Sequence, residues 1–180
     1  MKIEGSERVA LAPDVVWQGL NTPRVLQAST PGLVRLDETA PDHFEATLEI
    51  KLPAVTGRFE GTLDIVEREA PSRMKVKLKG KGAPGFVDGG AELFLTTAEG
   101  GTQVRYSADV QVGGQVARLG QRMLSGVSKE MAGQFFETFA KVAAPGGPAA
   151  GAAGAPAPPS ALRAFFSLLL RLARRLLNRG

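Results

Sequence analysis

Apolar and polar side chains alternate through most of the first 112 residues of the chain. Alternation at every second residue is typical of strands that have one face buried and the other in water. Two short helices interrupt the pattern, one opened by Pro13 and Asp14 and the other over residues 21–26. The predicted strands, separated by turn-forming residues, are residues 2–11, 33–38, 44–52, 58–69, 73–82, 86–97 and 102–112.

Residues 115–142 have a different periodicity, with apolar positions three or four residues apart, which predicts one long amphipathic helix. Its predicted buried stripe is Val116, Gly120, Met123, Val127, Met131, Phe135 and Val142. A strand, two short helices, six strands and a long helix make an α+β order. We expect a curved antiparallel sheet of about seven strands that wraps around the helix, a helix-grip domain over residues 1–143.

Small residues fall at inward positions of the predicted sheet, at Gly5, Gly61, Gly80 and Gly82. Glycine inside a strand marks a bulge or a close backbone approach, or it leaves volume unfilled against the helix. The sequence leaves both interpretations open, and both can hold. If the volume is an apolar cavity, its candidate lining residues are Leu48, Ile50, Phe59, Leu63, Val76, Leu78, Leu93, Tyr106, Ala108, Val110, Met123, Val127, Met131 and Phe135.

Beyond the long helix the sequence changes twice. Residues 144–159 consist of Pro, Gly and Ala, which predicts a flexible linker. Residues 160–180 predict a basic amphipathic helix that lies on a membrane. The apolar stretch between Arg163 and Arg171 is too short to cross a bilayer, so a membrane-spanning helix is not expected. The alternative is that this tail packs on its own domain or on another copy. Its membrane-binding candidates are Leu162, Arg163, Phe165, Phe166, Leu169, Arg171, Leu172, Arg174, Arg175 and Leu176.

The charge follows the same division. The net charge is +4 and the pI is about 9.7. Five of the 22 basic residues and none of the 18 acidic residues lie in the tail, so the rest of the chain has a net charge of −1. Four lysines alternate from Lys75 to Lys81, but no aromatic side chains interleave to stack bases, so we favour a solvated sheet face and no nucleic-acid partner.

The first residues of the chain are charged, whereas a signal peptide would have an apolar run there. We expect a domain at the cytoplasmic face of the cell membrane, peripheral through its tail.

No catalytic or metal-binding constellation emerges from the residue types. Cysteine is absent, and the single histidine, His43, is expected in a solvated turn, so nucleophile–base pairs and the usual metal clusters lack support. Tyr106 is the single tyrosine and is expected to face inward. Its hydroxyl then needs a partner, either a backbone group or the polar head of a ligand.

Four stretches of the chain resemble the G-subunit family of aerobic, molybdenum-containing carbon monoxide dehydrogenase. They are VWQGLNTPRVLQASTPG, GRFEGTLDI, GKGAPGFVDGGAELFLT and GGTQVRYSADVQVGGQVARLGQRMLSGVSKEMAGQFFETF. The similarity runs across residues 1–143, although the family often has a cysteine before the Pro-Gly pair, where this chain has Ser29 and Thr30. The resemblance implies a START-like helix-grip fold with a hydrophobic ligand between sheet and helix. It also implies a role in bringing the dehydrogenase to the membrane.

The pattern and the resemblance together lead to a functional hypothesis. Electrons from carbon monoxide oxidation must reach a respiratory quinone that is dissolved in lipid, and a tethered apolar pocket would shield its isoprenoid tail. We expect a non-enzymatic carrier that binds menaquinone or ubiquinone and couples the dehydrogenase to the inner leaflet of the cytoplasmic membrane. The alternatives are a plain recruitment adaptor without ligand and a polyketide-cyclase-like enzyme.

Two loops are candidate docking sites for the dehydrogenase, since proline and glycine fix the shape of a loop beside an apolar anchor. Phe86 is the expected anchor, although it could instead be buried as the first residue of a strand. The docking candidates are Pro31, Gly32, Pro84, Gly85 and Phe86.

Overall fold

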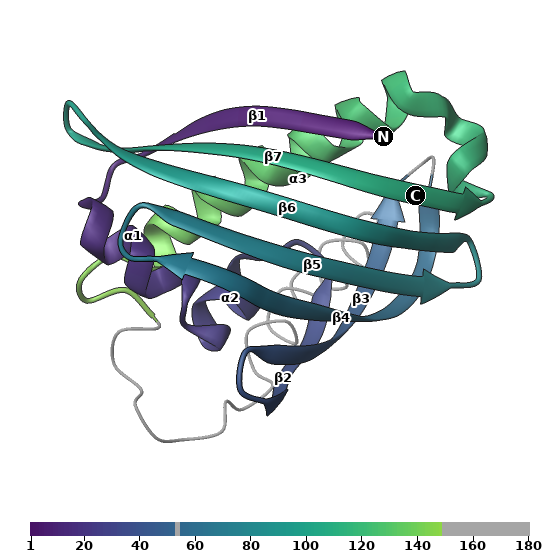
Figure 1. Ribbon diagram of the computed structural model, residues 1–180, viewed down its shortest axis with the longest axis horizontal. Helices are drawn as coiled ribbons and strands as arrows, with labels where there is room; N and C mark the ends of the chain where they lie inside the picture. Colours follow the sequence, from purple (N-terminus) through teal and green to yellow (C-terminus); the bar gives the residue numbers. More distant parts are fainter. Residues whose placement is uncertain (53–54, 149–180) are drawn as a thin grey trace, which may run out of the picture.

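The computed structural model describes residues 1–52 and 55–148 of the 180-residue chain (Figure 1). Most of the predicted linker and the whole predicted tail helix of residues 160–180 lie outside the described residues. Those two predictions therefore stay predictions.

Seven strands form one antiparallel sheet in the order β1-β7-β6-β5-β4-β3-β2. Hairpins join each pair of consecutive strands from β2 to β7, and β1 pairs with β7. The strands are β1 Lys2–Val9, β2 Leu33–Ala40, β3 His43–Leu52, β4 Val55–Glu69, β5 Arg73–Gly82, β6 Gly85–Ala98 and β7 Gly101–Gly114. All seven predicted strands are confirmed, with small differences at their ends.

The three α-helices lie on one side of the sheet, which curves around the longest of them (Figure 1). They are α1 Pro13–Leu20, α2 Pro23–Ser29 and α3 Gly120–Val142. We call the side of the sheet that faces α3 the inner face. The predicted α+β helix-grip fold is confirmed.

The start of the long helix differs from the prediction. Val116–Leu119 form a short 3₁₀ helix, η1, and α3 begins only at Gly120, whose φ is +73°. A residue with positive φ cannot continue a right-handed helix, and glycine adopts this conformation at little cost. The prediction of one helix from residue 115 onward is therefore wrong at its first turn.

The buried stripe of α3 is also rotated from the predicted one. Leu124, Phe136, Phe139 and Val142 are buried, whereas Met123 is 48% exposed. Successive residues of a helix differ by about 100° in direction, so Met123 turns away when its neighbour Leu124 faces the sheet. Met123 is therefore not a lining residue of an interior cavity.

The buried apolar side chains form two clusters at opposite ends of the strands. The α1 cluster lies where α1, α2 and the last turns of α3 cover the sheet, and it includes Val16, Val104 and Phe139. The η1 cluster consists of Val55, Phe59, Val116 and Leu124, with Leu48, Ile50 and Val112 among the residues packed on it. The core is thus divided, and the middle of the inner face lies between its two parts.

Candidate functional site

The middle of the inner face carries unusually small residues. Strand register places Ala46, Gly61, Gly80 and Val87 side by side on β3, β4, β5 and β6. A methyl carbon placed on Gly80 would meet no atom within 4 Å, so there is open space above the centre of the sheet. We call this space the central hollow.

The other inward glycines have a different role. A methyl carbon on Gly61 would clash with the carbonyl oxygen of Lys79, and one on Gly82 with the carbonyl oxygen of Arg58. A methyl carbon on Gly5 would clash with the hydroxyl group of Tyr106, which lies across that glycine. Of the four glycines singled out in the sequence, three therefore mark close approaches and one, Gly80, leaves volume open.

The structure distributes the predicted lining residues over three groups. Phe59, Leu48 and Ile50 belong to the η1 cluster or pack on it. Val76 belongs to the α1 cluster, and its partly buried neighbours Leu63, Leu93, Tyr106 and Phe135 pack against that cluster. The residues that belong to neither cluster are Leu78, Ala108, Val110, Met123, Val127 and Met131; of these, Val110 is buried and Met123 is exposed.

Four residues of the third group suit the central hollow. Leu78 and Ala108 are only half-buried although they lie on the inner face of central strands, and Val127 and Met131 on α3 are half-buried as well. An apolar side chain in the middle of a covered sheet is half-exposed when the space in front of it is unfilled. The sequence could not separate these residues from the two packed clusters.

Tyr106 brings a polar group to the inner face. Its ring stacks on Phe136 of α3, with centroids 6.3 Å apart. Within the described residues no group is hydrogen-bonded to the Tyr106 hydroxyl. Burial raises the pKa of this phenol, and the carboxylate of Glu7 contributes in the same direction. The hydroxyl is therefore protonated at neutral pH and can donate a hydrogen bond.

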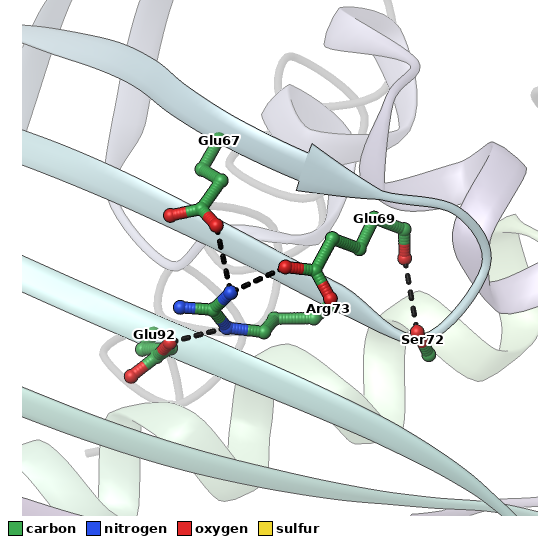
Figure 2. A network of polar contacts seen from close by, with 5 residues as sticks. All are labelled: Glu67, Glu69, Ser72, Arg73 and Glu92. Atoms are coloured by element: carbon green, nitrogen blue, oxygen red, sulfur yellow. Dashed lines mark hydrogen bonds and ion pairs between the residues drawn. The ribbon is translucent and has the colours of Figure 1, made fainter.

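The outer face of the sheet is covered with paired charges. In Figure 2, Arg73 on β5 reaches three carboxylates, with its Nη1 2.7 Å from Glu67 and 2.5 Å from Glu69, and its Nε 2.5 Å from Glu92. Charge-assisted bonds of this kind raise the pKa of Arg73 still further above its ordinary value. Lys79 lies 3.6 Å from Asp88. Because acidic side chains of neighbouring strands pair with these cations, the row of lysines on β5 is better interpreted as a solvated sheet face than as a nucleic-acid-binding surface.

The described residues offer little acid–base chemistry. The Nδ1 atom of His43 lies 2.5 Å from the Oδ1 atom of Asp64, and both side chains are partly exposed. Among residues 1–52 and 55–148, no three His, Asp or Glu side chains gather in a way that could hold a metal ion. None of the helices that the structure describes is long and apolar enough to cross a membrane.

The two candidate docking loops lie toward the same end of the sheet, because register aligns Leu33, Leu48, Phe59 and Gly82 in one row. Gly32 has a φ of +79°, and a methyl carbon there would clash with the carbonyl oxygen of Glu49. That turn therefore requires glycine.

In the second loop Pro84 is buried, and its carbonyl oxygen accepts a hydrogen bond from the Val116 amide at 3.0 Å. Gly85 begins β6. Phe86 follows in that strand on the outer face, where its ring covers Gly113 and it is 45% exposed. Phe86 thus lies in a strand without being buried.

A cleft that the sequence did not predict runs between α2 and α3. Its volume is about 310 Å³, and Ser29 and Pro31 lie in its wall opposite Gln134 and Thr138 of α3. The Ser29 residue is 2% exposed, and its hydroxyl oxygen is buried without a hydrogen-bond partner among the described residues. A small polar side chain next to a Pro-Gly turn gives no sequence signal of burial.

The curved sheet, the long helix behind it and the central hollow define the class of START-like helix-grip proteins. Solved structures with this fold include a conserved protein of Geobacillus kaustophilus, with 31% identity, a TM-score of 0.76, and coverage of 79% of this chain and 95% of that one. The ZhuI aromatase/cyclase of Streptomyces sp. R1128 is similar at 14% identity, with a TM-score of 0.58 and coverage of 79% and 93%. A Chromobacterium violaceum protein is similar at 13% identity, with a TM-score of 0.59 and coverage of 80% and 98%.

The family model of the carbon monoxide dehydrogenase G subunit (CoxG) matches residues 5–144. The chain belongs to this family, and the resemblance found in the sequence is confirmed. No match is found among curated proteins. The family is named for a subunit that accompanies carbon monoxide dehydrogenase, and the fold is the helix grip.

Proposed function

We propose that this protein is a membrane-tethered accessory protein of aerobic molybdenum carbon monoxide dehydrogenase that carries a respiratory quinone in the central hollow. The observation that carries the proposal is the open space above Gly80, which lies between two packed clusters on the covered face of the sheet. An ordinary domain of this size fills its core to nearly crystalline density. Unfilled space at this position is better explained by a ligand.

The chemistry of an isoprenoid quinone fits this space. Leu78, Ala108 and Met131 offer an apolar lining, and burial of an isoprenoid tail contributes roughly 25 cal/mol per Å² of apolar surface. A quinone head carries two carbonyl oxygens, which accept hydrogen bonds and donate none. A ligand that extends from the hollow along β7 to the α1 cluster would find a matching donor in the Tyr106 hydroxyl, which lies over Gly5 and lacks a protein partner among the described residues. The same chemistry suits menaquinone and ubiquinone.

Coupling to the respiratory chain requires contact with both the lipid and the dehydrogenase. The predicted tail, with five arginines and no acid, would hold the protein to the anionic inner leaflet of the cytoplasmic membrane. The family name supports carbon monoxide dehydrogenase as the partner. The loops around Pro31 and Phe86 are the candidate docking surface, since the exposed Phe86 ring stands beside a turn of fixed shape.

A second candidate is an enzyme of the polyketide-cyclase kind, because the ZhuI aromatase/cyclase shares the fold. Acid–base catalysis on an apolar substrate needs titratable groups that face the substrate. On the inner face the described residues provide Tyr106 and Glu7, both toward the α1 cluster and the β1 edge and away from the row of Gly80. We therefore favour a carrier without catalytic activity, and a plain recruitment adaptor with an empty hollow remains the third candidate.

The test is the ligand content of the purified full-length protein. Extraction with organic solvent followed by mass spectrometry is expected to recover menaquinone or ubiquinone in near-stoichiometric amount. Gly80→Leu should lose the quinone and stay folded, whereas the matched control Gly126→Leu should keep it, because Gly126 faces open space on the exposed side of α3. Tyr106→Phe should weaken quinone binding about tenfold. Protein that contains no quinone and takes up none on addition would leave the adaptor as the better description.

A further inference from the structure

The end of the molecule where β7 leads into α3 exposes cations next to a large apolar side chain. In Figure 1 the β5–β6 turn, the end of β7, η1 and the first turn of α3 gather at the right-hand end of the view. Arg118 in η1 and Arg122 in the first turn of α3 are exposed. Met123 is beside them and is 48% exposed. We call residues 115–123 the basic segment.

The cations of the basic segment are not neutralised by neighbouring acids. No Asp or Glu occurs in the sequence between Asp109 and Glu130. Arg118 and Arg122 form no ion pair with any residue that the structure describes. At the opposite end of the strands Arg68 is paired with Asp42 and Arg73 with three glutamates, whereas Arg8 and Arg105 form no ion pair with a described residue. The basic segment therefore carries two exposed arginines that have no counter-ion among the described residues.

We propose that the basic segment is a second membrane-contact site, which lies on anionic lipid with Met123 at the boundary between headgroups and acyl chains. Arginine beside a large apolar residue, with no acid nearby, is the composition of surfaces that lie on anionic bilayers. The predicted tail has the same composition. An acidic protein surface would match the cations but would leave the exposed Met123 side chain without an explanation.

This placement would orient the hollow relative to the membrane. Val116 and Leu124, on either side of the exposed residues, are part of the η1 cluster that closes this end of the inner face. A bilayer against the basic segment would thus lie next to the η1 cluster, and an apolar ligand that passes between these apolar side chains would reach the hollow without crossing water. The inference rests on the proposed function, because the tail must first bring the domain to the membrane.

The absence of cysteine from the chain allows a clean test with single labels on the full-length protein. Met123→Cys and the control Val66→Cys are each labelled with a polarity-sensitive fluorophore. Val66 is exposed to a similar extent, 45%, and lies near the opposite end of β4. The vesicles contain phosphatidylcholine and phosphatidylglycerol in equal amounts, with or without a quencher attached to the acyl chains.

The expected result is a blue shift and strong quenching at position 123 and no change at position 66. Replacing Arg118 and Arg122 with glutamine should reduce the quenching at position 123 severalfold while the protein still floats with the vesicles. Flotation without a response at position 123 overturns this inference and leaves the proposed function intact. Failure to float overturns both the inference and the membrane tether. A response at position 123 to purified dehydrogenase, and not to vesicles, would assign the segment to a protein partner instead.

Discussion

Gly80 is the position at which the central hollow can be tested without moving the backbone. It lies in β5, in the middle of the sheet, and a methyl group there would meet nothing within 4 Å. Replacing glycine with alanine inside a strand removes conformational freedom from the unfolded chain and is worth about 0.5–1 kcal/mol when the site has room. We therefore expect Gly80→Ala to raise the melting temperature by about 1–4 °C.

The paired residue Gly61 provides the matched control. It lies directly opposite Gly80 on β4, but its added methyl group would clash with the carbonyl oxygen of Lys79. A backbone atom cannot move aside as a side chain can, so Gly61→Ala should cost about 3 kcal/mol, the upper end of the usual range for overpacking.

Thermal unfolding followed by circular dichroism measures both variants, with and without a soluble ubiquinone analogue. Quinone should raise the melting temperature of the wild type and of Gly80→Ala, but not that of Gly80→Leu, which fills the hollow. The reasoning is refuted if Gly80→Ala and Gly61→Ala lose stability to the same extent. In that case position 80 has no more room than position 61.

Three further predictions concern other parts of the chain. Deleting residues 160–180 should abolish vesicle flotation and leave the melting temperature unchanged, and replacing Arg171, Arg174 and Arg175 with glutamine should cost about 1 kcal/mol of binding each on anionic vesicles. Equal binding to neutral vesicles would contradict the electrostatic part. Ser29→Ala should raise stability by about 1 kcal/mol, because it removes a buried hydroxyl group without a partner; a lower melting temperature would reveal a partner. Phe86→Ser should reduce capture of the dehydrogenase while quinone stays bound, and Val66→Ser should change neither.

The strands and the fold class were predictable because alternation is a local signal that the long hairpins of this sheet preserve. The phase of α3 was harder to predict, since Met123 and Leu124 are both apolar, as are Phe135 and Phe136, and two neighbouring stripes fit equally well. The structure buries Leu124 and Phe136. The roles of Gly61 and Gly80 could not be separated in advance, because the difference depends on strand register and not on residue type.

The division of the core has a consequence for how the protein responds to an empty hollow. The α1 cluster and the η1 cluster share the strands β3, β4 and β7 but are packed separately. Parts of a domain that share few side-chain contacts unfold locally, each with its own free energy of unfolding. Amide hydrogen exchange of the ligand-free protein should therefore give different protection for the α1 cluster and the η1 cluster. A molecule that fills the hollow touches both clusters and would join them into one cooperative unit. Cellular proteases would then degrade the ligand-free protein in preference to the quinone-bound protein. The amount of this protein in the cell would therefore depend on the concentration of quinone.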